Sequence, residues 1–154
     1  SDGYYVRAKI NNIGKYTAEN VEVMIVDLHK YNDNGVKERV VTFLPMNLVW
    51  SHYGGVSMSR ILPNHFRHID IGCLLLLGSN KVVLKIDTAT QPNKVEGGIY
   101  PNIIEFGHYE FTLIIGADNV STFSQKYSFI FISTLLNYNL GKLSPGKMVY
   151  KGRN

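Results

Sequence analysis

Cysteine is nearly absent from this chain of 154 residues, in which Cys73 is the sole thiol. A single cysteine cannot form an intrachain disulfide, so the small cross-linked scaffolds of secreted proteins are excluded. In its apolar surroundings we expect this thiol to be buried and inert. Long hydrophobic runs are missing too, because the longest, residues 73–77, is far shorter than the roughly 20 residues that span a bilayer. We therefore expect this stretch of chain to be soluble, with its compartment left open.

Motifs of catalysis and cofactor binding are also missing. The sequence contains no glycine-rich phosphate loop, and its "YGG" and "EGG" segments are too short to hold phosphates. A serine nucleophile would need a base and an elbow of the Gly-x-Ser-x-Gly type, which this chain lacks. Ser51 and His52 are adjacent, but neighbours along a strand face opposite ways. The sequence favours a protein that is not an enzyme, and it predicts no cofactor.

Acidic residues stop at Asp118, although the net charge of the whole chain is only +4. The basic residues that follow are spread through the C-terminal part and form no dense cluster of the kind that binds nucleic acid or lipid headgroups. We expect residues 135–154 to be a basic extension that either packs along the domain or contacts a partner chain. No nucleic-acid partner is expected, and membrane contact is expected only through flanking segments. The basic residues are Lys126, Lys142, Lys147, Lys151 and Arg153.

The composition is that of a packed globular domain, with 45% hydrophobic residues, ten Tyr and seven Phe. Period-two alternation marks residues 5–12 as a half-buried strand, and the alternation resumes over residues 21–30. Asn34-Gly35 predicts a tight hairpin turn, because both residues readily take positive φ angles, and a third strand is expected over residues 37–43. Nothing resembles an amphipathic helix longer than two turns, so the predicted class is all-β.

The rest of the chain continues in the same pattern. About eight short strands at this spacing indicate a sandwich or a barrel, and the lack of an internal repeat argues against a propeller. We expect one antiparallel β-sandwich of about 7–9 strands over residues 1–134. The later strand-like segments are residues 66–77, 80–89, 107–119 and 123–133, with two short strands before them and a connection at 116–122 between the last pair.

The segment "EFGHYEF" places Glu105, Gly107, Tyr109 and Phe111 in the pattern acid-x-Gly-x-Tyr-x-apolar. This pattern resembles the corner that enters strand F of immunoglobulin domains, where a tyrosine hydroxyl bonds to a loop backbone group. The resemblance implies that the Tyr109 ring packs inward and that Phe111 fills a position that is often Cys. Trp50, the only tryptophan, would then be the large core residue between the two sheets.

The segment "VRAKINNIGKYTAENVEVMIV" resembles the opening of adhesion-related (CARDB-like) sandwich modules of bacterial and archaeal proteins. "LVWS", "RHIDIG" and "HYEFTLIIGADN" resemble segments of uncharacterised prokaryotic proteins that carry such a module. The resemblance implies an immunoglobulin-like fold, placed beside a membrane anchor, and no known activity. Because the chain starts with Ser-Asp-Gly rather than Met, we expect it to be a piece of a longer protein.

The same N-terminal segment breaks its strand pattern at Gly14 and restarts it a few residues later. We expect Asn12 and Gly14 to form a turn that needs positive φ angles. Ala18 is small enough to lie under a loop, and Val21 is expected to restart a strand on the facing sheet.

Histidine and aspartate are close together in the segment "NHFRHID". Imidazole and carboxylate groups are ligands for zinc and other divalent ions, which makes His65, His68 and Asp70 the candidate metal ligands. Strand geometry places His65 and His68 on opposite faces, so only two of the three ligands share a face. His52 or His108 would have to complete the site. The sequence therefore favours surface histidines over a metal site.

Aromatic residues in loops are the other candidates for function. Trp50 and Tyr53 flank the segment "SHYGG", and Tyr100 lies in a polar loop rich in Gly and Pro. Flat rings at such places can stack on sugars or line a protein interface, although we favour Trp50 as a core residue. Asn119-Val120-Ser121 matches the N-glycosylation triplet, which arises often by chance and is given no weight.

The sequence specifies no activity. The expected function is that of a non-catalytic interaction or accessory module within a larger, membrane-tethered prokaryotic protein, acting through its loops or an exposed sheet edge. A carbohydrate-binding module that uses Trp50, Tyr53 and Tyr100 is the first alternative. A metal-dependent enzyme that uses His65, His68 and Asp70 is the second.

Overall fold

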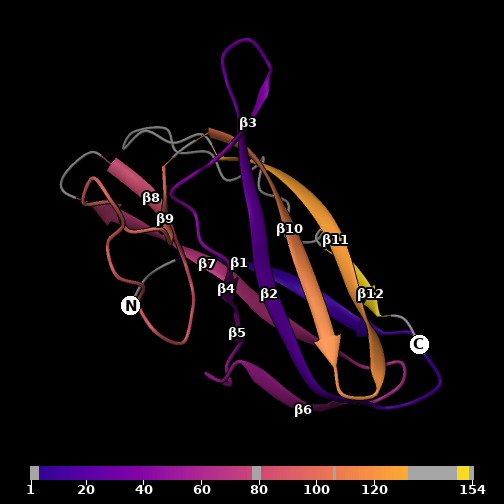
Figure 1. Cartoon of the computed structure of the whole chain (residues 1–154). Coiled ribbons are helices and arrows are strands. Elements are labelled where there is room, and N and C mark those ends of the chain that lie inside the picture. Colours follow the sequence, from indigo (N-terminus) through magenta and orange to yellow (C-terminus); the bar gives the residue numbers. More distant parts are fainter. Residues whose placement is uncertain (1–3, 78–80, 106, 132–148, 153–154) are drawn as a thin grey trace.

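The protein is an all-β sandwich, as predicted, in which two sheets pack face to face and do not close into a barrel. The computed structural model describes residues 4–77, 81–105, 107–131 and 149–152, and these contain strands and no helix. Figure 1 shows the sheets as two layers, with β2, β10 and β11 in front of β1 and β7. Within the described ranges there is thus no helix with the length and apolarity needed to cross a membrane.

The first sheet, sheet A, has β1 and β7 at its centre. Its order is β12-β1-β7-β8-β9, and β5 also pairs with β7. The pairings are antiparallel except that of β12 with β1, which is parallel. The strands are β1 (Tyr4–Asn12), β5 (Val49–Trp50), β7 (Phe66–Leu77), β8 (Lys81–Ile86), β9 (Ile103–Ile104) and β12 (Val149–Gly152).

The second sheet, sheet B, is organised around one long strand, β2. One edge of β2 pairs with β10, which pairs with β11, while β3, β4 and β6 share the other edge. All these pairings are antiparallel. The strands are β2 (Ala18–Tyr31), β3 (Lys37–Arg39), β4 (Met46–Asn47), β6 (Ser57–Ile61), β10 (Gly107–Ala117) and β11 (Val120–Phe131).

The long strand β2 keeps its apolar face inward by means of one irregularity. Val21, Val23 and Ile25 alternate with exposed or half-buried residues, as the sequence predicts, and are almost fully buried. At Asp27 the backbone takes a φ of 53°, and the register with β10 shifts at the same place. This extra residue is a β-bulge, and it returns Leu28 to the core.

The hairpin after β2 confirms the predicted turn. Of Asn34 and Gly35, only Gly35 takes a positive φ, of 77°. The side-chain oxygen of Asn32 accepts hydrogen bonds from the backbone N–H groups of Asn34 and Val36. The predicted strand over residues 37–43 is too long, because β3 ends at Arg39 and the chain then turns. Phe43 leaves the sheet and is buried in the core, which accounts for the shorter strand.

The turn after β1 differs from the prediction. Neither Asn12 nor Gly14 has a positive φ angle, and the left-handed residue of this region is Asn20. The buried Asn12 side chain shapes the turn instead, since its oxygen accepts from Gly14 N at 2.9 Å and its nitrogen donates to Tyr16 O and Ile61 O. Hydrogen bonding by an asparagine side chain thus replaces the expected backbone angle. The next strand does lie in the facing sheet, but it starts at Ala18.

Two aromatic predictions for the core are confirmed. Trp50 is fully buried, and its indole N–H lies 3.1 Å from both Val21 O and Val56 O. Tyr109 is also buried, and its hydroxyl donates to Glu105 O at 2.9 Å. Phe111, two residues further along β10, is 1% exposed. Trp50 therefore belongs to the core and cannot serve as the contact residue that the carbohydrate-binding alternative required.

The ends of the predicted elements differ in detail. The connection between β10 and β11 is shorter than residues 116–122, because only Asp118 and Asn119 separate the two strands. The predicted boundary at residue 134 lies outside the described residues.

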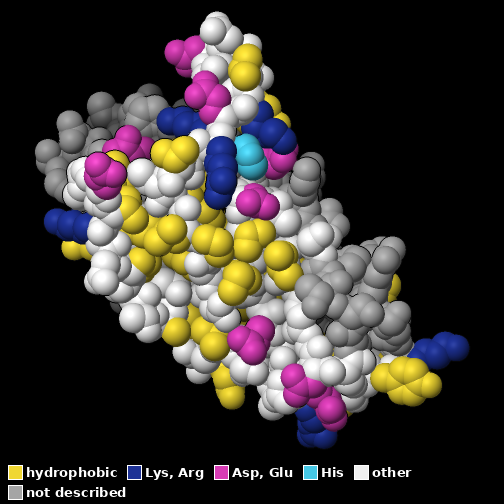
Figure 2. Space-filling view, viewed as in Figure 1, with side chains coloured by type: hydrophobic (Ala, Val, Ile, Leu, Met, Phe, Trp, Pro, Cys, Tyr) yellow, Lys and Arg dark blue, Asp and Glu magenta, His cyan; other side chains and the backbone are white. Residues whose placement is uncertain are grey.

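On the outer face of sheet B, Met24, Val26 and Ile114 are only half-buried, and hydrophobic side chains gather in the centre of this face (Figure 2).

The Tyr109 hydroxyl makes a testable contribution to stability. In the Tyr109→Phe variant the Glu105 carbonyl loses this donor, which is expected to cost about 0.5–1.5 kcal/mol of the free energy of unfolding. For a domain of this size, that corresponds to a fall in Tm of roughly 1–6 °C. Thermal unfolding followed by circular dichroism measures the change. Tyr16→Phe is the matched control, because Tyr16 is 70% exposed, and an equal loss in both variants would contradict the role of the corner contact.

Candidate functional site

The three candidate metal ligands lie in one part of the chain but in different surroundings. His65 lies in the loop before β7, with Nδ1 2.9 Å from Pro63 O, and His68 is exposed on β7. Asp70 is only 7% exposed. His108, a predicted additional ligand, stacks on Tyr31 in sheet B. Across the described part of the chain, no three His, Cys, Asp or Glu side chains come together as a metal-binding group.

Asp70 is bound by two side chains from neighbouring segments. Arg7 Nε donates to its Oδ1 at 2.8 Å, and the Ser51 hydroxyl donates to the same oxygen. Arg7 on β1 and Val49 on β5 are the residues directly opposite Asp70 in the sheet. The carboxylate therefore links β1, β7 and the segment after β5, and its hydrogen bonds hold the start of the loop that follows Trp50.

Two other titratable groups lie close to Asp70. Burial raises the pKa of the Asp87 carboxyl, and the negative charge of Asp70 raises it further. Burial also raises the pKa of the Cys73 thiol, with the charge of Asp87 as the second cause. The thiol is therefore kept in its protonated, less reactive form, in agreement with the prediction that Cys73 is buried and inert.

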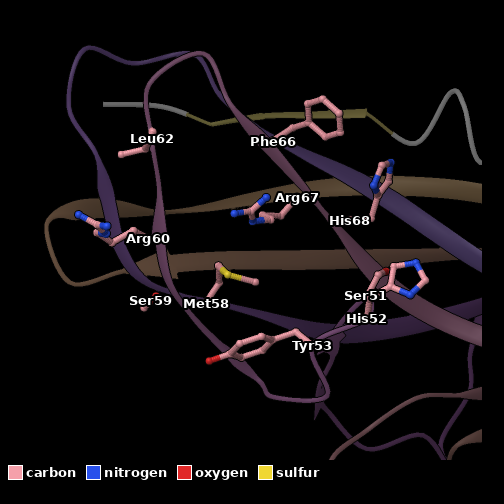
Figure 3. Close-up of a pocket in the computed structure, with 10 residues that line it drawn as sticks. All are labelled: Ser51, His52, Tyr53, Met58, Ser59, Arg60, Leu62, Phe66, Arg67 and His68. Carbon is pink, nitrogen blue, oxygen red and sulfur yellow. The ribbon is translucent and has the colours of Figure 1, made fainter.

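An open groove lies beside these residues, at the end of the sandwich where β6 runs. It has a volume of about 590 Å³ and lies between the edge of sheet B, formed by β6, and the first residues of β7 in sheet A. The loop after β5 forms a third side. The largely buried Met58 contributes to its surface. Figure 3 shows the Arg67 guanidinium over the middle of the groove, with the Tyr53 ring along one side and Arg60 towards the far end.

The groove is lined by two arginines and two histidines. Arg60, Arg67, His52 and His68 line it, and its lining contains no carboxylate. Of the described residues, none forms an ion pair with either arginine. Glu19 is the residue opposite Arg60 in the pairing of β2 with β6, but it is not part of the groove. The groove is therefore a place where anions are attracted.

Two aromatic rings border the groove. Tyr53 is 59% exposed and Phe66 is 43% exposed. The Lys9 ammonium lies 4.0 Å from the centre of the Phe66 ring, and His68 contacts the same ring edge-on. Lys9 thus covers part of Phe66, whereas Tyr53 presents its ring to solvent. An exposed tyrosine beside arginines is typical of contact surfaces.

The structure separates the predicted aromatic contacts. Tyr53 lines the groove, but Trp50 is buried and Tyr100, 40% exposed, is not a lining residue. Tyr100 instead lies beneath the ammonium of Lys94, at 5.1 Å. Arg60 and Arg67 were not among the site residues predicted from the sequence. Their only signal was that both flank the segment "ILPNHF", a turn that brings the ends of two strands together.

Comparison of the chain with known protein families, with curated proteins and with solved structures finds no match to any of them. A function for this chain must therefore be inferred from its own geometry.

The raised pKa of Asp87 predicts a pH-dependent effect on stability. Because the folded state favours the protonated carboxyl, its ionisation weakens the fold as pH rises, so removal of the charge should stabilise the protein at about pH 7. Asp87→Asn is expected to raise Tm at that pH, and the gain should shrink on acidification through the raised pKa. Scanning calorimetry at a series of pH values measures this. Asp33→Asn, on an exposed turn, is the control, and a gain for Asp87→Asn that does not depend on pH would contradict the assignment.

Proposed function

We propose that this chain is an immunoglobulin-like sandwich that serves as a non-catalytic binding module, and that the groove beside Arg67 is its ligand site. The observation that carries the proposal is the convergence of arginines and an exposed tyrosine in a groove without a carboxylate. The resemblance of the N-terminal segment to adhesion-related modules supports an accessory role within a larger prokaryotic protein.

The immunoglobulin-like type is supported by one contact and by the strand order. The bond from Tyr109 OH to Glu105 O lies near the start of β10, where immunoglobulin domains have their tyrosine corner at strand F. With β10 as strand F, β2 and β11 correspond to strands C and G, and β1 and β7 to strands B and E. The chain departs from that pattern in β8 and β9, which follow β7 in the sequence and extend sheet A, and in Phe111, which stands where Cys is frequent.

A binding role is favoured over a reaction by the chemistry of the groove. General acid–base catalysis would need a titratable group within hydrogen-bond reach of a substrate together with a partner that activates it. The hydroxyl of Ser51, which lines the groove, is bonded to the Asp70 carboxylate, and Asp70 is bound by Arg7 as well. These groups support the sheet, whereas the arginines and Tyr53 remain available for a ligand.

Nuclear magnetic resonance tests this proposal without a choice of ligand. The isotope-labelled protein is titrated with acidic and neutral oligosaccharides, acidic peptides and single-stranded oligonucleotides, while each probe is followed for conversion. At least one probe is expected to shift the amide resonances of Arg60, Arg67 and Tyr53. The hairpin turn at residues 32–36, which projects from the opposite end of β2 (Figure 1), is the internal control and should not respond.

Two outcomes would contradict the proposed function. Shifts confined to other surfaces would show that the groove is not the ligand site. Conversion of a probe over time, lost on substitution of a groove residue, would show that the protein is a catalyst and not a binding module.

A further inference from the structure

We propose that the ligand of the groove is an acidic saccharide, that is, a sugar chain carrying carboxylate or sulfate groups. This inference rests on the proposed function, since it names the ligand class of the same groove. Three features carry it: the position of Arg67, the exposed ring of Tyr53, and an edge of β7 that is already occupied.

Arg67 lies where the core of the sandwich ends. It is two residues before Ile69 on β7, so it belongs to the face of the strand that packs inward, yet it is exposed. Its guanidinium lies in the middle of the groove, which Met58 on β6 also lines (Figure 3). A guanidinium presents two parallel N–H donors to a carboxylate or sulfate and is less strongly hydrated than an ammonium group. It is thus placed to bind an anionic group that enters the groove.

Arg60 extends the positive charge across the groove from Arg67, and Lys9, which does not line the groove, adds a cation beside it. Arg60 lies on β6 across the groove, and Lys9 lies over the ring of Phe66. Glu19, opposite Arg60, reduces the local charge but forms no ion pair with it among the described residues. Cations on opposite sides of a groove match a ligand whose charges are spaced along a chain, as in a polymer of acidic sugars.

Tyr53 provides the surface for the sugar ring itself. Its side chain is 59% exposed and lies along the groove (Figure 3). The C–H face of a pyranose packs on such a ring, while the phenol hydroxyl and the Ser59 hydroxyl can exchange hydrogen bonds with sugar hydroxyls. A volume of about 590 Å³ lies within the usual range of small-ligand sites, roughly 300–1,000 Å³.

Other anionic polymers fit the groove less well. An acidic peptide that adds as a strand needs a free sheet edge. On β7, His68 O already accepts a hydrogen bond from Ser51 N at 2.8 Å, which leaves the edge of β6, a strand of five residues, as the place in the groove where such a peptide could pair. Single-stranded nucleic acid needs a basic track with several stacking rings in succession. Here Tyr53 is the ring that is well exposed, because Lys9 covers part of Phe66.

Isothermal titration calorimetry tests the ligand class. The full chain is titrated with oligogalacturonate, a heparin-derived oligosaccharide, carboxyl-reduced oligogalacturonate, polyglutamate and oligothymidylate, with the charged probes matched in charge. One of the two acidic saccharides is expected to bind at least tenfold more tightly than the other three probes. Which of the two binds better distinguishes carboxylate from sulfate recognition. Added salt should weaken this binding, since part of it is electrostatic.

Single substitutions identify the groups responsible. Arg67→Gln is expected to weaken saccharide binding about tenfold, and Arg67→Lys, which keeps the charge but loses the paired donors, about threefold. Tyr53→Ala is expected to weaken it about fivefold to tenfold through loss of stacking. Arg39→Gln, a matched charge control on β3, and Tyr16→Ala, a matched exposed ring, should stay within about twofold of the parent, at unchanged Tm.

The inference is overturned by any of three results. The first is that polyglutamate or oligothymidylate binds as tightly as the acidic saccharides. The second is that the neutral saccharide does so, and the third is that the Arg67 and Tyr53 variants match their controls. If the first occurs while resonance shifts still map to the groove, the proposed function stands and only the saccharide assignment fails. If no probe shifts the groove resonances, both proposals fail.

Discussion

The indole of Trp50 links the two sheets of the sandwich, and the groove depends on that link. Trp50 belongs to β5 in sheet A, but its side-chain N–H donates to Val21 O on β2 in sheet B. Its backbone also anchors the following loop, because Trp50 O accepts hydrogen bonds from Tyr53 N and Gly54 N. A fully buried side chain of this size has few alternative positions. The core therefore fixes the loop that carries Tyr53.

The opposite side of the groove is held by a polar contact instead of an apolar one. Asp70 binds Arg7 and Ser51 near the start of β7, which fixes the strand segment on which Arg67 and His68 lie. The Asp70 carboxylate, two residues after the lining residue His68, thus has its hydrogen-bond partners outside the groove arginines. As a result, Asp70 does not pair with Arg60 or Arg67. The same contact thus stabilises the sheet and leaves the positive charge of the groove uncompensated by Asp70.

The strands and core were predictable because they depend on local patterns. Alternation along β2 and the Asn34-Gly35 turn act over a few residues, and the Tyr109 corner is a short motif whose partner, Glu105, lies four residues away. The turn at Asn12 was mispredicted because its shape comes from a side chain that reaches Ile61, far along the chain. Asn12 and Gly14 correctly indicated that the chain turns here. They did not indicate which hydrogen bonds the Asn12 side chain would form.

The groove was less predictable for a related reason. Tyr53 was a candidate because an aromatic residue in a glycine-containing loop is visible in the sequence. Arg60 and Arg67 belong to strands of different sheets, so the sequence alone could not show that both border one groove. The alternation that places Ile69 in the core also places Arg67 on the inward face of β7. The sequence does not show that the core ends before Arg67, because that depends on how the two sheets pack.

Stability alone does not account for arginines at the open end of the core. Two cations that border one groove repel each other, and the described residues supply no carboxylate partner for either. An apolar residue in the inward register of Arg67 could instead extend the core over Met58 and bury more surface. Features that reduce stability without a compensating contact within the fold are characteristic of sites that serve a ligand. The cost in stability and the exposed position of the arginines therefore both support the proposal that the groove is a ligand site.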